Sequence, residues 1–140
     1  MKKIAKKLTL FFTAGCLGGL TNSLAVWLFG LLGITKIFGV SIAPPLTPEW
    51  LYPRIVWGGL WGVIFLIPVL KNRLLIKGLL LSLGPTLVQL LVVFPFKAQK
   101  GFLGLDLGLL TPLFVVLFNA VWGVTAAYWI KYIKADVANI

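Results

Sequence analysis

The chain has 140 residues, of which 60% are hydrophobic and 11% charged, and its mean hydropathy is +1.04. That composition argues against an ordinary soluble domain. Histidine is absent and Cys16 is the single cysteine, so the ligand clusters of zinc, haem and iron–sulfur centres are missing and we expect no cofactor. A net charge of +10 would suggest nucleic acid as a partner for a soluble protein, but these cations flank apolar segments and favour lipid headgroups instead.

Four apolar segments predict four transmembrane helices, at about residues 8–33, 48–70, 74–96 and 109–133. A hydrocarbon core about 30 Å thick takes ~20 residues of helix to cross, and a helix satisfies its own backbone there. No Asp, Glu, Arg or His lies in the middle of any segment, so the usual ionisable markers of proton relays and ion pathways are missing. We expect an all-α bundle in which residues 1–140 form a single transmembrane domain.

Charges at the segment borders predict the orientation. Four lysines precede the first segment, as in a signal peptide, but the apolar run continues to about Leu32 and suits a membrane span better. An N-in, C-in arrangement puts most of the cations inside, which favours cytoplasmic termini. The inner set is Lys2, Lys3, Lys6, Lys7, Lys71, Arg73, Lys77, Lys131 and Lys134, and the outer set is Lys36, Arg54, Lys97 and Lys100. Lys77, one turn into the third segment, is expected to extend back to the inner surface.

The stretch between the first two helices, about residues 34–53, is long, apolar and rich in proline. Solvated loops carry more charge, so we expect this one to lie in the outer interface or to fold over the helix ends. Aromatic side chains near the segment borders are predicted interfacial anchors. They are Trp50, Tyr52 and Trp57 at the outer border, and Tyr128, Trp129 and Tyr132 at the inner one.

A short motif occurs twice at a nearly constant spacing. Leu46-Thr47-Pro48 precedes Val56-Trp57-Gly58, and Leu110-Thr111-Pro112 precedes Val121-Trp122-Gly123. Thr47 and Thr111 are predicted N-caps, each followed by proline at the first helical position. Either a helical hairpin has been duplicated about an axis along the membrane normal, or two helices that enter lipid start alike by convergence. Convergence is the favoured interpretation.

Three amide side chains inside the predicted spans, Asn22, Gln89 and Asn119, share one depth. At 1.5 Å per residue all three lie ~5 Å to the outer side of the midplane. Thr86 and Ser82 share a helix face with Gln89. These residues could form a polar pocket for a neutral solute, a lipid or a pigment headgroup. They could also hydrogen-bond the helices together, which is the commoner use of such residues and the favoured interpretation.

Small residues predict close helix contacts. Gly15 and Gly19 form a Gly-x-x-x-Gly pair, as do Gly58 and Gly62, and Gly123 with Ala127 is a looser version. The partner helix could belong to this chain or to another.

The order of features after the first helix resembles the YagU-like bacterial inner-membrane proteins. The residues that carry it are Trp57-Gly58-Gly59, Lys77-Gly78-Leu79-Leu80, Gln89, Phe94-Pro95, Thr111-Pro112 and the stretch from Asn119 to Trp129. The resemblance covers roughly the last two-thirds of the chain. It implies a small helical protein of the bacterial inner membrane with no established chemistry, and it supplies no catalytic residues.

Three functions are open on the sequence. The favoured one is a non-catalytic accessory or assembly subunit that packs against other membrane proteins, with pigment binding as a variant. The alternative is a small transporter, channel or lipid-handling protein, acting as a homo-oligomer, with its polar site in the outer half of the membrane. The least favoured is a lipid-directed enzyme with Glu49 and Asp106 as paired carboxylates. We expect no enzyme.

Overall fold

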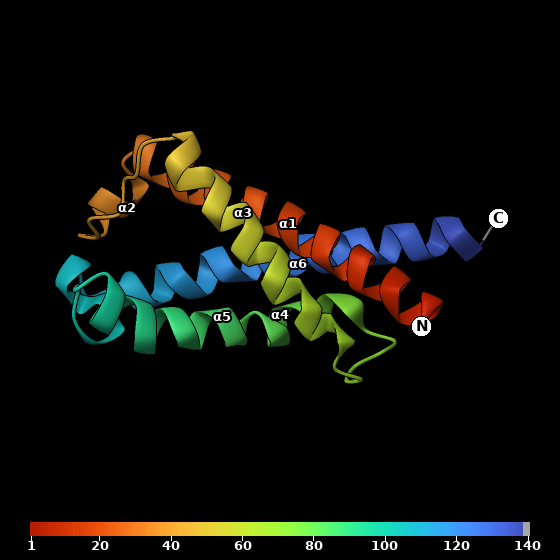
Figure 1. Ribbon diagram of the computed structural model, residues 1–140. Coiled ribbons are helices and arrows are strands. Elements are labelled where there is room, and N and C mark those ends of the chain that lie inside the picture. The colour runs from red at the N-terminus through yellow and green to blue at the C-terminus, as the bar shows by residue number, and fades with distance from the viewer. Residues whose placement is uncertain (139–140) are drawn as a thin grey trace.

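The computed structural model describes residues 1–138, and their side chains as far as residue 134. Over that range the chain is all-α (Figure 1). Its α-helices are α1 (Lys2–Leu31), α2 (Ile34–Ile37), α3 (Pro48–Gly62), α4 (Leu74–Leu81), α5 (Leu83–Val88) and α6 (Thr111–Ala138). Two 3₁₀ turns, η1 (Val63–Leu66) and η3 (Phe102–Leu107), and a π-helical segment, η2 (Gln89–Lys97), complete it.

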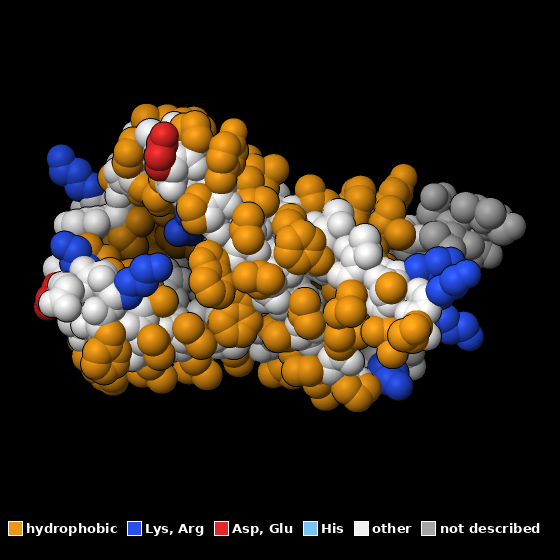
Figure 2. Space-filling view, viewed as in Figure 1, with side chains coloured by type: hydrophobic (Ala, Val, Ile, Leu, Met, Phe, Trp, Pro, Cys, Tyr) orange, Lys and Arg blue, Asp and Glu red, His pale blue; other side chains and the backbone are white. Residues whose placement is uncertain are grey.

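Three stretches of helix are long and apolar enough to cross a membrane: Lys2–Leu31, Leu74–Lys97 and Thr111–Lys134. The space-filling view agrees with a membrane location, because hydrophobic side chains cover the middle of the visible face and basic ones gather towards its ends (Figure 2). The second predicted span differs from expectation. It ends at Leu66 and does not reach residue 70, because Ile67 precedes Pro68 and takes an extended conformation with ψ of 124°.

The third stretch is interrupted at Ser82, between α4 and α5. Pro85 has no N–H to donate to Leu81, one turn earlier, so the regular ladder cannot continue there. Two hydroxyl groups beside the interruption bond to carbonyls of their own segment: Ser82 donates to the Leu79 carbonyl at 2.6 Å, and Thr86 donates to the Ser82 carbonyl at 2.7 Å. From Gln89 onward the helix widens into the π-helical η2, which also contains Pro95.

The helices form two antiparallel hairpins. α1 packs on α3, α4 packs on α6, and α1 joins the two hairpins by packing on α6. Both described ends of the chain lie at the same end of the molecule as the 67–73 connection, whereas α2 and η3 lie at the opposite end (Figure 1). This arrangement agrees with termini on one side of the membrane. The end with the termini is called the inner end below, and the end with α2 the outer end.

Glycines allow each hairpin to cross closely. A Cβ atom on Gly15 would collide with the Gly58 carbonyl, and one on Gly58 would lie 2.8 Å from the Gly19 Cα atom. In the second hairpin, Gly78 and Gly123 each face the carbonyl of the other. The predicted packing glycines therefore meet partners inside this chain.

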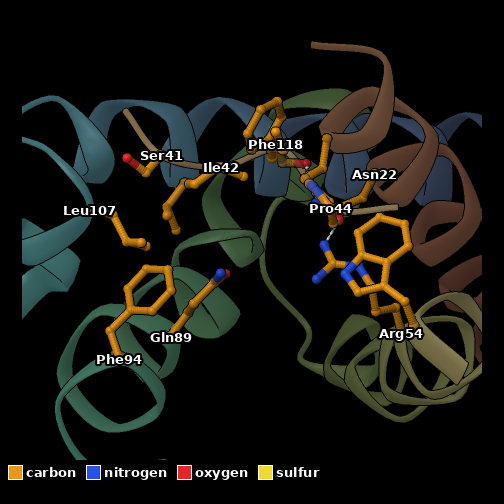
Figure 3. A pocket seen from close by; sticks show the side chains of 13 residues that line it. Asn22, Ser41, Ile42, Pro44, Arg54, Gln89, Phe94, Leu107 and Phe118 are labelled. Carbon is orange, nitrogen blue, oxygen red and sulfur yellow. Dashed lines mark hydrogen bonds between the residues drawn. The ribbon is translucent and has the colours of Figure 1, made fainter. Parts of the chain in front are cut away.

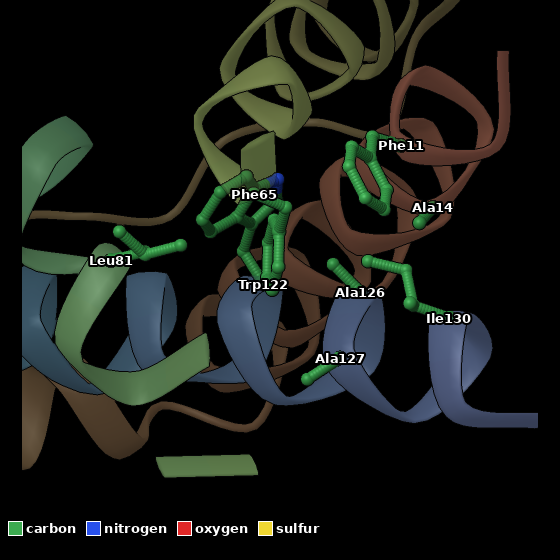
Figure 4. Packing of buried hydrophobic residues seen from close by; sticks show 8 residues of the cluster. All are labelled: Phe11, Ala14, Phe65, Leu81, Trp122, Ala126, Ala127 and Ile130. Atoms are coloured by element: carbon green, nitrogen blue, oxygen red, sulfur yellow. The ribbon is translucent and has the colours of Figure 1, made fainter. Parts of the chain in front are cut away.

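The largest apolar cluster lies towards the inner end and joins all four long segments (Figure 4). Trp122 is at its centre, only 3% exposed, with its ring centroid 6.0 Å from that of Phe65. The indole Nε1 donates to the carbonyls of Gly15 and Gly58, at 3.2 and 3.3 Å. Close helix crossing and aromatic packing thus depend on the same glycines. The remaining members are Phe11, Ala14, Leu81, Ala126, Ala127 and Ile130.

The loop before α3 folds over the helix ends, as expected. Thr35 donates to the Ile42 carbonyl at 2.7 Å, and the Ser41 amide donates to the Leu107 carbonyl of η3 at 2.8 Å. The loop ends at Thr47, because residues 48–53 belong to α3, which starts at Pro48 as predicted. Thr47 caps that helix by accepting from the Trp50 amide.

The prediction that Thr111 caps the last helix is wrong. Its hydroxyl is buried and makes no hydrogen bond within the described residues. The first α-helical bond of this region runs from the Phe114 amide to the Leu110 carbonyl, so the turn has already begun before Thr111.

Candidate functional site

The centre of the candidate site is Arg54, in the second turn of α3. Its Nε donates to the Ser23 hydroxyl oxygen at 2.9 Å, and its Nη2 donates to Asn22 Oδ1 at 2.8 Å. The guanidinium carbon also lies 4.7 Å from the ring centroid of Trp50, one turn earlier in the same helix. α1 and α3 thus hold the cation from both sides between the helices.

This position corrects the sequence interpretation, which counted Arg54 among the cations of the outer border. The helix begins at Pro48, six residues before Arg54 in the numbering, so the arginine lies within α3 and faces α1. An ionisable group inside the helical part of the chain is therefore present. The Thr47-Pro48 start signal contained the information needed to place it there.

A chain of hydrogen bonds runs from Arg54 across the bundle. Asn22 Nδ2 donates to the Phe118 carbonyl at 2.6 Å and approaches Asn119 Oδ1 at 3.4 Å. Asn119 Nδ2 in turn donates to Thr86 Oγ1 at 3.1 Å and to Gln89 Oε1 at 3.3 Å. α1, α6, α5 and the start of η2 thus contribute one amide or hydroxyl each.

Four of the polar residues singled out in the sequence therefore meet, namely Asn22, Gln89, Asn119 and Thr86. Ser82 lies one turn away, and its hydroxyl donates to the backbone of its own helix. The neighbouring hydroxyl of Thr21 pairs with Thr125 at 2.9 Å, which adds a further link between α1 and α6.

Arg54, Asn22 and Gln89 line a cavity of about 370 Å³ beneath the loop that precedes α3. We call it the outer cavity. Figure 3 shows Arg54 and Gln89 on opposite sides of it, and Figure 2 shows the hollow at this end with a basic side chain inside. Its other walls come from α1, the loop, α3, η2, η3 and α6: Val26, Ser41, Ile42, Ala43, Pro44, Trp50, Phe94, Leu107, Val115 and Phe118.

The same three polar residues also line a second space of about 500 Å³, between α3 and the α5–η2 segment. We call it the lateral groove. Its walls are largely apolar and include Trp57 and Trp61 from α3, and Val88 and Val93 from the facing segment, with Lys97 near one end. α3 packs on α1 and diverges from α5 and η2 towards the outer end (Figure 1). The groove thus lies between α3 and a segment from which α3 diverges (Figure 1).

The donors and acceptors of the site are unbalanced in favour of donors. A guanidinium has five N–H groups, and the two hydrogen bonds of Arg54 use one at Nε and one at Nη2. Within the described residues Nη1 makes no hydrogen bond, and no carboxylate lines either the outer cavity or the lateral groove. The planar fork of arginine suits bidentate contact with carboxylate or phosphate. The site can therefore bind an anion.

The predicted interfacial anchors divide into two groups. Tyr52, Trp57, Tyr128 and Tyr132 are exposed, as anchors would be. Trp50 and Trp129 are partly buried; Trp50 stacks on Arg54 in the outer cavity, and Trp129 packs against the apolar cluster and stacks on Tyr132. Glu49 and Asp106, the carboxylates considered for acid–base chemistry, do not line either space around Arg54.

Comparison with family models, with curated proteins and with solved structures gives no match for this chain. The resemblance to YagU-like proteins stays a prediction, and the site is interpreted from its own geometry.

Proposed function

We propose that the chain is a small integral membrane protein that binds the anionic headgroup of an amphiphile in the outer half of the membrane. The observation that carries this proposal is the guanidinium of Arg54, which has unused donors and lies where the outer cavity and the lateral groove meet. In this proposal Arg54 and Gln89 bind the headgroup, and the apolar walls of the groove hold the tail.

The shape of the site favours an amphiphile over a free solute. The lateral groove beside Arg54 is lined mainly by apolar residues, so a ligand with an apolar tail would remove more apolar surface from water there than a free polar solute would. The lateral groove lies between two helices that diverge, so a lipid could enter from the side without leaving the membrane. Binding of this kind belongs to the lipid-handling alternative rather than to an accessory subunit.

The accessory-subunit hypothesis loses one of the features that motivated it. It relied on glycine faces as well as interfacial tryptophans for packing against other proteins, and those glycines face each other within this chain. Association with other membrane proteins or with a second copy stays a prediction.

We further propose that α3 with η1 forms the fourth span. Fifteen α-helical residues and four 3₁₀ residues together rise about 30 Å, enough to cross a hydrocarbon core. With both termini cytoplasmic, as the border charges favour, Arg54 lies in the outer half of a bacterial inner membrane.

Substitution of the arginine tests the proposed function. We expect Arg54→Gln to weaken binding of a long-chain fatty acid roughly 10- to 100-fold, because it removes hydrogen bonds to a charged group worth ~1.5–3 kcal/mol. Arg54→Lys keeps the charge without the fork and should be intermediate. Affinity is measured on the purified protein in nanodiscs of zwitterionic lipid, with a monoacylglycerol as the uncharged comparison.

The matched control is Arg73→Gln, the same chemical change at an exposed residue of the connection between η1 and α4. It should leave fatty-acid affinity unchanged. Thermal unfolding establishes that both the Arg54→Gln protein and the unsubstituted protein are folded. If the two folded proteins bind the fatty acid with equal affinity, the proposed function is contradicted.

A further inference from the structure

A second cavity of about 270 Å³ lies at the inner end, away from Arg54 and the amide network. We call it the lysine cavity, because Lys7, Lys71, Lys77 and Lys134 all line it. They come from α1, the 67–73 connection, α4 and α6, so distant parts of the sequence converge on one site. Basic side chains are visible at this end of the space-filling view, as they are at the outer end (Figure 2).

Lys77 is the deepest of the four. It is only 6% exposed, and its ammonium donates to the Phe65 carbonyl at 2.8 Å. The sequence predicted that this side chain would extend to the membrane surface, and that prediction is wrong. The carbonyl of Phe65 belongs to the last turn of η1, where helix carbonyls lack regular partners, so an inward lysine satisfies it. Two of its three N–H donors are left for a ligand.

Among the side chains that the structure describes, no acidic residue lines the cavity to balance these charges. Glu49 is in the first turn of α3 and Asp106 is in η3, and both of these segments lie at the outer end of the molecule (Figure 1). Asp136 lies beyond the side chains that the structure describes. Four cations around one cavity repel one another unless an anion lies between them.

We propose that the lysine cavity binds the terminal phosphate of an anionic lipid of the inner leaflet. The other lining residues are all apolar: Phe11, Phe65, Leu66, Pro68, Leu74 and Ile130. None has a hydroxyl or amide side chain with which to recognise a sugar or polyol headgroup, whereas a phosphomonoester needs only charge and N–H donors. Basic pockets between transmembrane helices on the cytoplasmic side are suited to phosphate headgroups.

This inference does not rest on the Arg54 proposal, since the two sites share no lining residue. The shared ligand chemistry is a phosphate group, which a membrane lipid or a soluble phosphate ester could supply. The apolar lining and the membrane-border position favour the lipid, because a lipid also fills the apolar part of the cavity with its first methylene groups.

The test compares two double variants of the full chain in nanodiscs. Lys71→Gln with Lys134→Gln removes two exposed cations of the cavity and leaves the buried Lys77 in place. Lys2→Gln with Lys131→Gln removes two exposed cations of the same end that do not line the cavity. Phosphatidic acid and phosphatidylglycerol are titrated into phosphatidylcholine nanodiscs, and glycerol 3-phosphate is added as the soluble competitor.

We expect the unsubstituted protein to bind phosphatidic acid more tightly than phosphatidylglycerol. The cavity variant should lose roughly 30-fold in affinity for phosphatidic acid, since each lysine near an anionic surface contributes on the order of 1 kcal/mol. The Lys2/Lys131 variant should lose less than threefold. Equal losses in the two double variants, or equal affinity for the two lipids, would overturn the proposal. Stoichiometric displacement by glycerol 3-phosphate would overturn the lipid as the source of the phosphate.

Discussion

At the scale of single residues, the question is whether the charged Arg54 side chain is stable inside the helix bundle when no anion is bound. An arginine near the centre of a membrane helix costs ~2.5–3.5 kcal/mol by insertion measurements. Its two hydrogen bonds contribute ~1.5–3 kcal/mol each, and the stacking on Trp50 adds ~0.5–1 kcal/mol. These contacts offset the cost without a carboxylate. Arg54 is therefore stable in place before any anion arrives, and its remaining donors stay available.

Gln89 offers a direct way to alter the charge of this site. Gln89→Glu keeps the oxygen that accepts from Asn119 and places a carboxylate in the cavity that contains Arg54. We expect affinity for a fatty acid to fall at least tenfold, because the new carboxylate competes with the ligand for the guanidinium. Equilibrium binding in nanodiscs measures this.

Gln89→Leu serves as the control for the lost amide. It removes the hydrogen bond from Asn119 without adding charge, so it should weaken the ligand less than Gln89→Glu does. If both variants bind the fatty acid as tightly as the unsubstituted protein, Gln89 does not face the headgroup.

The sequence was a good guide to the amide residues and a poor one to the arginine. A rise of 1.5 Å per residue is enough to place Asn22, Gln89 and Asn119 at one depth, and the structure joins them in one network. Arg54 was assigned to the outer border because it follows the predicted start of the second span, residue 48, by only six residues. The lost cap at Thr111 could not be foreseen, since the preceding turn already begins at Leu110.

At the scale of helices, two kinds of glycine position can be distinguished by what a methyl group would meet. A Cβ atom on Gly62 would collide with the Phe11 carbonyl of α1, which is backbone and cannot move away. A Cβ atom on Gly84 would lie 3.5 Å from the Trp61 ring, an ordinary contact. Only the first glycine is required by packing.

Alanine substitutions should separate these positions. Gly62→Ala should lower the free energy of unfolding by ~1–3 kcal/mol through overpacking of α1 on α3. Gly84→Ala should be neutral or raise it by up to ~1 kcal/mol, because alanine favours the helix more than glycine does. Thermal or denaturant unfolding in detergent measures both, and a Gly62→Ala protein as stable as the unsubstituted one would show that α1 and α3 are not in close contact.

Helix boundaries were predictable where a local signal exists. The Thr47-Pro48 start of α3 agrees with its cap, and Pro68 explains why the helix cannot reach residue 70. The interruption at Ser82 follows from Pro85, but the π-helical form of η2 has no signal in the hydropathy pattern. The segment packs on η3 and α6, and these contacts between distant parts of the chain are not readable from a single sequence.

For the whole molecule, the two hairpins are alike in their crossing and unlike in their sites. Each crosses at a glycine next to a tryptophan, Gly58 after Trp57 and Gly123 after Trp122. Trp122 is buried at the centre, however, whereas Trp57 is 60% exposed and lines the lateral groove. Duplication of the hairpin stays a prediction. If it occurred, the lateral groove belongs to the first hairpin, whose tryptophan, Trp57, is exposed.

Among the described residues, the lateral groove and the lysine cavity are not joined by a continuous polar path. Trp122 lines the lateral groove, Phe65 lines the lysine cavity, and their rings pack against each other. An ion or polar solute would have to cross this apolar cluster. The arrangement therefore favours binding at each surface over conduction through the bundle.

The orientation in the membrane decides which leaflet each site meets, and it can be measured directly. A Cys16→Ala background removes the single native thiol. Asn72→Cys at the inner end and Gln99→Cys at the outer end are both at exposed positions. The border charges predict that a membrane-impermeant maleimide labels Gln99→Cys in intact cells and labels Asn72→Cys only after permeabilisation. The reverse pattern would move Arg54 to the inner half and the lysine cavity to the outer surface. The headgroup chemistry of both sites would survive that result, but an inner-leaflet lipid could no longer be the ligand of the lysine cavity.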